Sequence, residues 1–190
     1  MSRRSRLYGL GRLCGIFLAA LMAALITFYH YGLRLALSDS ATSAGVYQFA
    51  PLHGTPAHGE LVGACLPASI ADIALDRGYA TVSLWSACPN GAPPVGKLVL
   101  GLPGDTIVVE PGFVTINGRR FANSATGARD SQGRTLTHVP WGIRHVNKGE
   151  VWLFGFNDAR SWDSRYYGPL PLTALRWKAT PVLTLGASPR

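Results

Sequence analysis

The sequence predicts a mainly β, antiparallel domain attached to a membrane by one N-terminal helix. Two observations predict this class. Residues 13–33 (LCGIFLAALMAALITFYHYGL) carry no formally charged side chain. As a helix this stretch would span about 30 Å, the thickness of a bilayer core. From Phe49 onward, short apolar and β-branched runs alternate with Gly and Pro, a pattern typical of strands and turns. The 190 residues leave room for one folded domain after the anchor.

Basic residues set the predicted topology. Four arginines precede the apolar span: Arg3, Arg4, Arg6 and Arg12. By the positive-inside rule, residues 1–12 form a cytoplasmic tail, residues 13–33 the single anchor and residues 34–190 an exported domain. We therefore expect a single-pass membrane protein with its folded domain on the far side of the membrane from the cytoplasm. A cleaved signal peptide is the alternative, but the apolar run is long for that role and no clean A-x-A site follows it.

The formal net charge of +8 does not indicate nucleic-acid binding. Four of these charges belong to the predicted cytoplasmic tail, and the remaining basic residues form neither a run nor a helical stripe. Such scattered charge is typical of a solvated surface, here one facing a membrane. We expect no nucleic-acid partner.

Seven segments are expected to be strands: Glu60–Cys65, Gly96–Gly101, Thr106–Val109, Phe113–Ile116, Arg119–Phe121, Glu150–Gly155 and Trp177–Leu185. Asn117-Gly118 suits a type I′ turn because both residues tolerate positive φ. Thr106–Phe121 is therefore predicted to be a three-stranded meander. Near-helical apolar spacing predicts a helix over Ser69–Arg77. Arg34–Tyr47 is expected to be a connector.

Cysteine usage agrees with an exported domain. Cys14 lies in the predicted anchor, which leaves Cys65 and Cys88 as the only pair outside it. Two cysteines in an oxidising compartment more often pair than stay free, so we expect a disulfide. The sequence has no Cys/His ligand spacing, and we expect no metal and no cofactor. His53 and His58 are expected to be solvated histidines in a Pro/Gly loop.

One lysine stands out among the basic residues. Only Lys97, Lys148 and Lys178 are lysines, and Lys97 lies in the apolar run VGKLVLGL. A lysine on a strand can extend its amine to solvent, which would make Lys97 an ordinary surface residue. It can also be a general base, and the residues alone leave both interpretations open. A Ser/His/Asp triad is possible by composition, but none of the five histidines has a recognisable active-site context.

Two blocks resemble the signal peptidase I superfamily. Residues 97–107 (KLVLGLPGDTI) are similar to its pattern K-R-V-x-G-L-P-G-D-x-I, and residues 155–168 (GFNDARSWDSRYYG) to G-D-N-x-x-x-S-x-D-S-R-x-x-G. Within that superfamily, the single anchor, Cys65-Leu66-Pro67 and residues 88–91 (CPNG) look most like the TraF-type peptidases of conjugative transfer. The resemblance implies a signal peptidase I-like antiparallel β catalytic domain.

The nucleophile segment departs from the pattern. The TraF-type segment N-x-T-x-S-x-P-x-G-x-Y corresponds here to residues 35–47 (LALSDSATSAGVY), with Ser40 as the implied nucleophile and Ser38 at the threonine position. One extra residue precedes Gly45, and Thr42 or Ser43 replaces the proline. Ser43 and a chain that has lost activity are the alternatives.

The resemblance also implies a role for each matched residue. Lys97 would be the general base for Ser40, Ser38 and the Ser40 amide would form the oxyanion hole, and Ser161 would orient Lys97. Asp163 and Arg165 look like a buried structural ion pair, and Leu98 replaces the family arginine. An exposed lysine with a pKa near ~10.4 is neutral in only about one molecule in a few thousand at pH 7. An apolar surround disfavours the charged amine and increases that fraction.

The expected function is that of a membrane-bound serine endopeptidase that uses a Ser/Lys dyad. The resemblance implies a pilin-type or signal-peptide-bearing precursor as substrate and the conjugation apparatus as a possible partner. Two alternatives remain open at this level. One is a catalytically silent structural subunit of a conjugation or secretion apparatus, and the other is a general signal peptidase, which the single anchor disfavours.

Overall fold

A computed structural model describes residues 3–36, 41–80 and 88–185, with burial described from residue 12 onward. The chain divides into two compact units, Met1–Arg34 and Leu35–Arg190. Ser38 and Ser40 lie outside the described residues.

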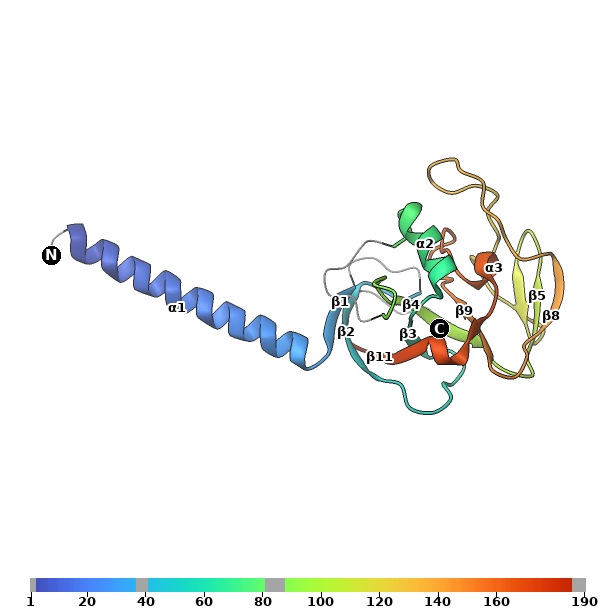
Figure 1. The fold of residues 1–190 in the computed structure, drawn as a ribbon, viewed down its shortest axis with the longest axis horizontal. Coiled ribbons are helices and arrows are strands. Elements are labelled where there is room, and N and C mark those ends of the chain that lie inside the picture. The colour runs from blue at the N-terminus through green and yellow to red at the C-terminus, as the bar shows by residue number, and fades with distance from the viewer. Residues whose placement is uncertain (1–2, 37–40, 81–87, 186–190) are drawn as a thin grey trace. The chain divides into compact units, whose positions relative to one another are not determined.

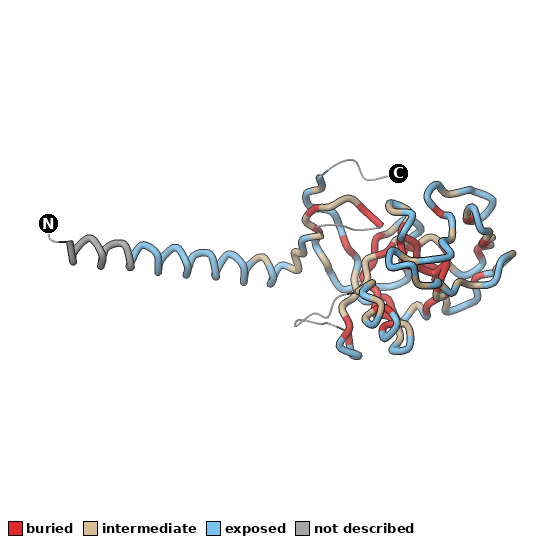
Figure 2. The backbone as a smooth tube through the Cα atoms, turned by 90° about the horizontal axis from the view of Figure 1, so that it is seen from above, coloured by how far each residue is buried: buried red, intermediate tan, exposed pale blue. Residues whose placement is uncertain are grey.

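Helix α1 (Arg3–His30) forms the first unit. Residues 12–30 are long and apolar enough to cross a membrane, and none of this stretch is buried within the protein. Its large apolar side chains, such as Leu13 and Ile26, are exposed. Figure 2 shows most of the helix in the colour of exposed residues. The helix ends three residues before the predicted end of the anchor because Gly32 takes a positive φ of 70°. An apolar helix of this kind fits a membrane anchor.

The second unit contains a seven-stranded sheet in the order β1-β2-β11-β3-β4-β9-β10. Its strands are β1 (Leu33–Ala36), β2 (Gly45–Pro51), β3 (Leu61–Ala64), β4 (Val95–Gly101), β9 (Glu150–Phe154), β10 (Leu170–Pro171) and β11 (Leu175–Thr184). All pairings from β2 to β10 are antiparallel. Three short helices accompany them, namely α2 (Ala68–Asp76), α3 (Ser164–Tyr167) and the 3-10 helix η1 (Leu172–Ala174).

A four-stranded antiparallel sheet has the order β7-β6-β5-β8. It contains β5 (Thr106–Val109), β6 (Val114–Ile116), β7 (Arg119–Arg120) and β8 (Gly142–His145), and Figure 1 shows β5 beside β8. The predicted meander corresponds to β5, β6 and β7. Asn117 and Gly118 have φ values of 50° and 79°, as a type I′ turn requires. The fourth strand, β8, was not predicted.

The predicted fold class, mainly antiparallel β, is confirmed by these two sheets. Strand β9 links their cores because its side chains alternate between two buried faces. Val151 and Leu153 pack in one hydrophobic cluster with α2, β3 and β4. Trp152 and Phe154 pack in a second cluster with the four-stranded sheet. Figure 2 shows the buried residues concentrated inside this unit.

The interpretation of Arg34–Tyr47 as a connector is wrong at both ends. β1 begins at Leu33, and β2 begins at Gly45 and pairs with β11 over its whole length. A Cβ atom at position 45 would collide with the Leu183 carbonyl oxygen, so the close pairing requires glycine there. This contact places the end of the predicted nucleophile segment on the sheet.

Candidate active site

Lys97 lies in the middle of β4, opposite Val62 of β3. Its side chain is buried, with 7% of the residue exposed, and its Nζ donates a hydrogen bond of 2.9 Å to Ser161 Oγ. The interpretation of Lys97 as a surface lysine that reaches solvent is therefore wrong. A buried amine needs a hydrogen-bond partner, and the protein supplies one from a segment 64 residues away.

Ser161 is itself fixed by its surroundings. It is 3% exposed, and its backbone N–H donates to the Asp158 carbonyl at 3.0 Å. Its carbonyl accepts a hydrogen bond of 2.9 Å from Arg165 Nη2. The hydroxyl that contacts Lys97 is thus held by the backbone of the same block that carries Arg165.

Asp163 and Arg165 form an ion pair in which neither side chain is exposed. Arg165 Nε and Nη2 each donate to Asp163 at 2.8 Å, a bidentate geometry. Asp163 also accepts the Gly155 N–H, and Arg165 Nη1 donates to the Ala125 carbonyl at 2.7 Å. Burial alone would lower the pKa of Arg165, but Asp163 more than offsets this and the pKa is raised. Asp163 thus connects Gly155, at the start of the block, with Arg165, near its end.

Asp158 and Arg160 form a second, exposed ion pair next to Ser161. The hydrogen bonds from the Arg160 side chain and backbone lower the pKa of Asp158, and the positive charge of Lys97 adds a smaller effect in the same direction. Asp158 therefore lies within electrostatic reach of the lysine. The sequence did not single out this residue, because it occupies a variable position of the block pattern.

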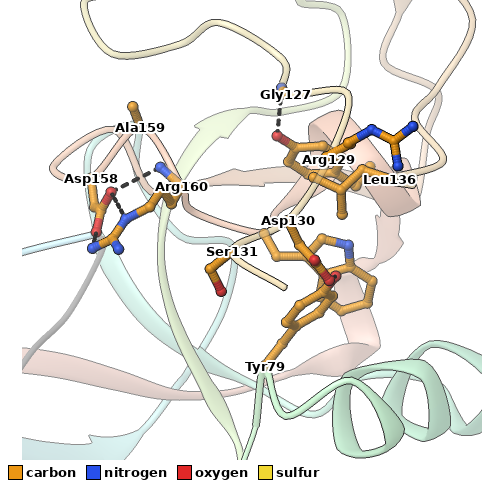
Figure 3. Close-up of a pocket in the computed structure, with 11 residues that line it drawn as sticks. Tyr79, Gly127, Arg129, Asp130, Ser131, Leu136, Asp158, Ala159 and Arg160 are labelled. Atoms are coloured by element: carbon orange, nitrogen blue, oxygen red, sulfur yellow. Dashed lines mark hydrogen bonds and ion pairs between the residues drawn. The ribbon is translucent and has the colours of Figure 1, made fainter. Parts of the chain in front are cut away.

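A cavity of about 370 Å³ adjoins the block (Figure 3). Ala159, Arg160 and Trp162, which flank Ser161 in the chain, line one part of it. Tyr79 and Asp130 line another part and are joined by a hydrogen bond of 2.7 Å. Burial opposes ionisation of Asp130, but hydrogen bonds from Tyr79 and Arg134 outweigh it, so the pKa of Asp130 is lowered. Two charged side chains of the cavity wall, Asp130 and Asp158, are thus already bonded to other lining residues.

The chain that follows Ser40 is described from Ala41 onward. Ala41 and Thr42 are buried, at 1% and 6% exposure. The Thr42 carbonyl accepts a hydrogen bond of 2.8 Å from Asn157 Nδ2, and the Ser43 carbonyl accepts one of 2.6 Å from Tyr47 Oη. Neither contact was predicted. The first connects this segment to the block 155–168, and the second lies within the segment 35–47 itself.

Two charged positions of the family pattern carry apolar residues here. Leu98 replaces the arginine after the lysine, and Phe156 stands where the pattern G-D-N has its aspartate. Leu98 lies opposite Phe154 in the β4–β9 pairing, and the Phe154 and Phe156 rings are 4.9 Å apart. Apolar packing therefore occupies both positions.

The remaining predicted residues are placed as follows. Cys65 and Cys88 form a disulfide, and Cys14 is free. His58, expected to be solvated, is half-exposed and contacts Asp105 at 2.6 Å. The reason is that the turn after β4 brings Asp105 to the loop that carries His58. Among the described residues, no group of three or more His, Cys, Asp or Glu side chains could hold a metal ion.

The family model of signal peptidase, peptidase S26, matches residues 10–183. This chain belongs to that signal peptidase family, and this membership supports a peptidase-like role. It is 34% identical to the conjugal transfer protein TraF of Agrobacterium tumefaciens (strain 15955), over 96% of this chain and 97% of that one. It is also 34% identical to the conjugal transfer protein TraF of Agrobacterium fabrum (strain C58 / ATCC 33970), over 74% of this chain and 76% of the other. The resemblance to the TraF-type branch is thereby confirmed.

A crystal structure of a signal peptidase I from Enterococcus faecalis V583 matches with a TM-score of 0.36 and 20% identity. The match covers 70% of this chain and 100% of that chain.

Proposed function

We propose that this protein is a membrane-bound serine endopeptidase in which Ser40 is the nucleophile and Lys97 the general base. The observation that carries the proposal is the buried Lys97 amine with its 2.9 Å bond to the Ser161 hydroxyl. A lysine without a catalytic task is seldom kept buried, because burial disfavours its charged form. Membership of the signal peptidase family supports peptide-bond hydrolysis as the reaction in which this lysine would act.

The reaction would proceed through an acyl-enzyme. Neutral Lys97 Nζ takes the proton from Ser40 Oγ while Oγ forms a bond to the scissile carbonyl carbon. The protonated amine then gives this proton to the leaving nitrogen as the peptide bond breaks. A water molecule, deprotonated by the same amine, hydrolyses the ester and returns Ser40 to its free form. Proton and bond changes balance within the dyad, and no cofactor is needed.

Ser161 and the Asp163–Arg165 pair would prepare the base for this role. Ser161 accepts a hydrogen bond from the amine and so fixes the direction in which the remaining nitrogen positions point. Arg165 holds the Ser161 carbonyl, which transmits the rigidity of the buried ion pair to the serine. The Ser38 hydroxyl and the Ser40 amide are proposed as oxyanion donors on the family resemblance.

The proposed substrate is a pilin-type or signal-peptide-bearing precursor of a conjugation system. Two relatives that match this chain at 34% identity are conjugal transfer proteins. Helix α1 would hold residues 34–190 on the periplasmic side of the inner membrane, with residues 1–12 in the cytoplasm. A precursor that emerges from the same membrane would meet the site close to the anchor, because Ser40 follows the apolar span by few residues.

A catalytically silent structural subunit is the second candidate. The extra residue between Ser40 and Gly45 favours it, as do the apolar residues at Leu98 and Phe156. Processing of the precursor separates the candidates. We expect Ser40→Ala and Lys97→Ala each to abolish processing in cells, and Ser43→Ala to process normally. Full processing by the Ser40→Ala protein would reject the serine assignment.

Mating assays separate a dedicated peptidase from a general one. Deleting this protein should block plasmid transfer while a general exported protein is still processed. Loss of general processing with normal mating would indicate a general signal peptidase. A mating defect that the Ser40→Ala protein rescues would indicate the structural subunit.

A further inference from the structure

We infer that Asn157 is a positioning residue of this active site: its side-chain amide holds the segment that follows the nucleophile. The inference rests on the proposed Ser/Lys function. Asn157 Nδ2 donates a hydrogen bond of 2.8 Å to the Thr42 carbonyl, across 115 residues of chain. Thr42 is only two residues beyond Ser40, so this bond restrains the backbone from which the nucleophile extends.

The same short stretch holds the other member of the dyad. Four residues after Asn157, the Ser161 hydroxyl accepts the hydrogen bond of Lys97 Nζ. The stretch between them is closed by the Ser161 N–H to Asp158 carbonyl bond of 3.0 Å. One turn therefore contacts the general base at one end and the nucleophile segment at the other. Such a turn holds Lys97 and the backbone at Thr42 relative to each other, and proton transfer to a nucleophile two residues before Thr42 would depend on this.

The segment around Thr42 needs such a restraint. Ala41 packs in a buried cluster with Tyr47, Leu61 and Ala179, which places the segment against the sheet. Thr42 is buried, yet among the described residues its Oγ1 finds no hydrogen-bond partner. Burying an unpaired hydroxyl is unfavourable, so the threonine side chain does not stabilise this position. The carbonyl bonds made by Asn157 and Tyr47 do so in its place.

Asn157 contributes this bond without being part of the core. The residue is exposed, whereas its acceptor Thr42 is buried. An exposed asparagine can be replaced with little loss of packing, so a change in rate would report the contacts of its side-chain amide and not the packing of the core. Replacing Asn157 would not remove the hydrogen bond between Lys97 and Ser161, because that bond is made by a different residue of the turn.

The test is acylation of the full-length protein in detergent micelles by a serine-reactive penem. Asn157→Leu removes the donor at nearly constant volume and without adding charge. We expect acylation to slow by roughly 10- to 100-fold, as for a displaced catalytic group. The pH at half-maximal rate should stay unchanged. The melting temperature should fall no further than in Asn90→Leu, which also loses one hydrogen bond to a backbone carbonyl, and Asn157→Ala should behave in the same way. Asn157→Gln, which keeps the donor, should restore most of the rate.

Asn90→Leu is the matched control. Asn90 is also exposed, and its Nδ2 donates a hydrogen bond of 2.9 Å to a distant backbone carbonyl, that of Leu66. Its acylation rate should equal that of the unmodified protein. The inference is overturned if Asn157→Leu reacts at the unmodified rate, shifts the pH midpoint, or reacts no more slowly than Asn157→Gln. Ser40→Ala separates this failure from that of the proposed function, because persistent acylation there would reject the nucleophile itself.

Discussion

Removing the carboxylate of the buried Asp163–Arg165 pair should destabilise the folded domain by about 3–5 kcal/mol, because it leaves an uncompensated guanidinium in the interior. Neither side chain is exposed, and Asp163 accepts two hydrogen bonds from Arg165 at 2.8 Å each. Asp163→Asn keeps the shape and removes the charge. Folded domains have a stability of about 5–15 kcal/mol, so the loss would consume a large part of it.

The assay is urea unfolding of the full-length protein in micelles, followed by tryptophan fluorescence. Asp158→Asn is the control, since it breaks the exposed Arg160 pair and should cost at most about 1 kcal/mol. A second variant, with Asp163→Leu and Arg165→Met together, should recover much of the stability because no buried charge is left unpaired. A loss below about 1 kcal/mol for Asp163→Asn would refute the assignment of this pair as the structural support of the block.

Three further predictions concern stability. Reduction of the Cys65–Cys88 disulfide, which spans 23 residues, should lower the unfolding free energy by about 3–4 kcal/mol in the chain-entropy model; an unchanged urea midpoint after reduction would contradict this. Burial alone would raise the pKa of Asp105, but hydrogen bonds from Asn117, His58 and Leu102 outweigh it and the net pKa is lowered. A carboxyl with a lowered folded-state pKa stabilises above its unfolded pKa of about 4 and loses this contribution as the pH falls through the folded value. Asp105→Asn should therefore weaken the acid dependence of the melting temperature, and an unaltered acid dependence would contradict the assignment. Thr42→Val, which removes a buried hydroxyl that bonds to no described residue, should raise the unfolding free energy by about 1 kcal/mol, and a destabilised variant would contradict this.

The strands that could be predicted are those whose own residues specify them. Val95–Gly101 is apolar apart from Lys97, Thr106–Val109 is apolar after its first residue, and Asn117-Gly118 fixes the turn after Val114–Ile116. Strand β8 (Gly142–His145) has only four residues, two of them charged or imidazole-bearing, and its pairing with β5 defines it. Its sequence GIRH lacks the β-branched, apolar run that identified Thr106–Val109, a strand of the same length.

Strand β2 was missed for a different reason. Its sequence GVYQFAP begins with glycine and ends with proline, both of which usually mark turns. The glycine is required by close approach to Leu183, a contact that only the folded sheet reveals. The proline lies at the end of the pairing with β11, where it opposes Trp177.

The residues of the candidate site also include some that could be predicted from the sequence and one contact that could not. Lys97, Ser161, Asp163 and Arg165 could be named in advance, because they occupy specific positions of two matched blocks. Asn157 occupies the asparagine position of the second block, yet its contact was not predicted. The acceptor is a backbone carbonyl 115 residues away. Because every residue has a backbone carbonyl, the residue type at position 42 does not indicate that it accepts this bond.

The central claim, a Ser40–Lys97 dyad, is tested most directly by mapping the acyl adduct. The full-length protein in micelles is treated with a serine-acylating penem, digested and analysed by peptide mass spectrometry. The dyad predicts one adduct, located on Ser40, which is absent from the Lys97→Ala protein and unaffected by Ser43→Ala. An adduct on Ser43, or equal labelling of the Lys97→Ala protein, would contradict it.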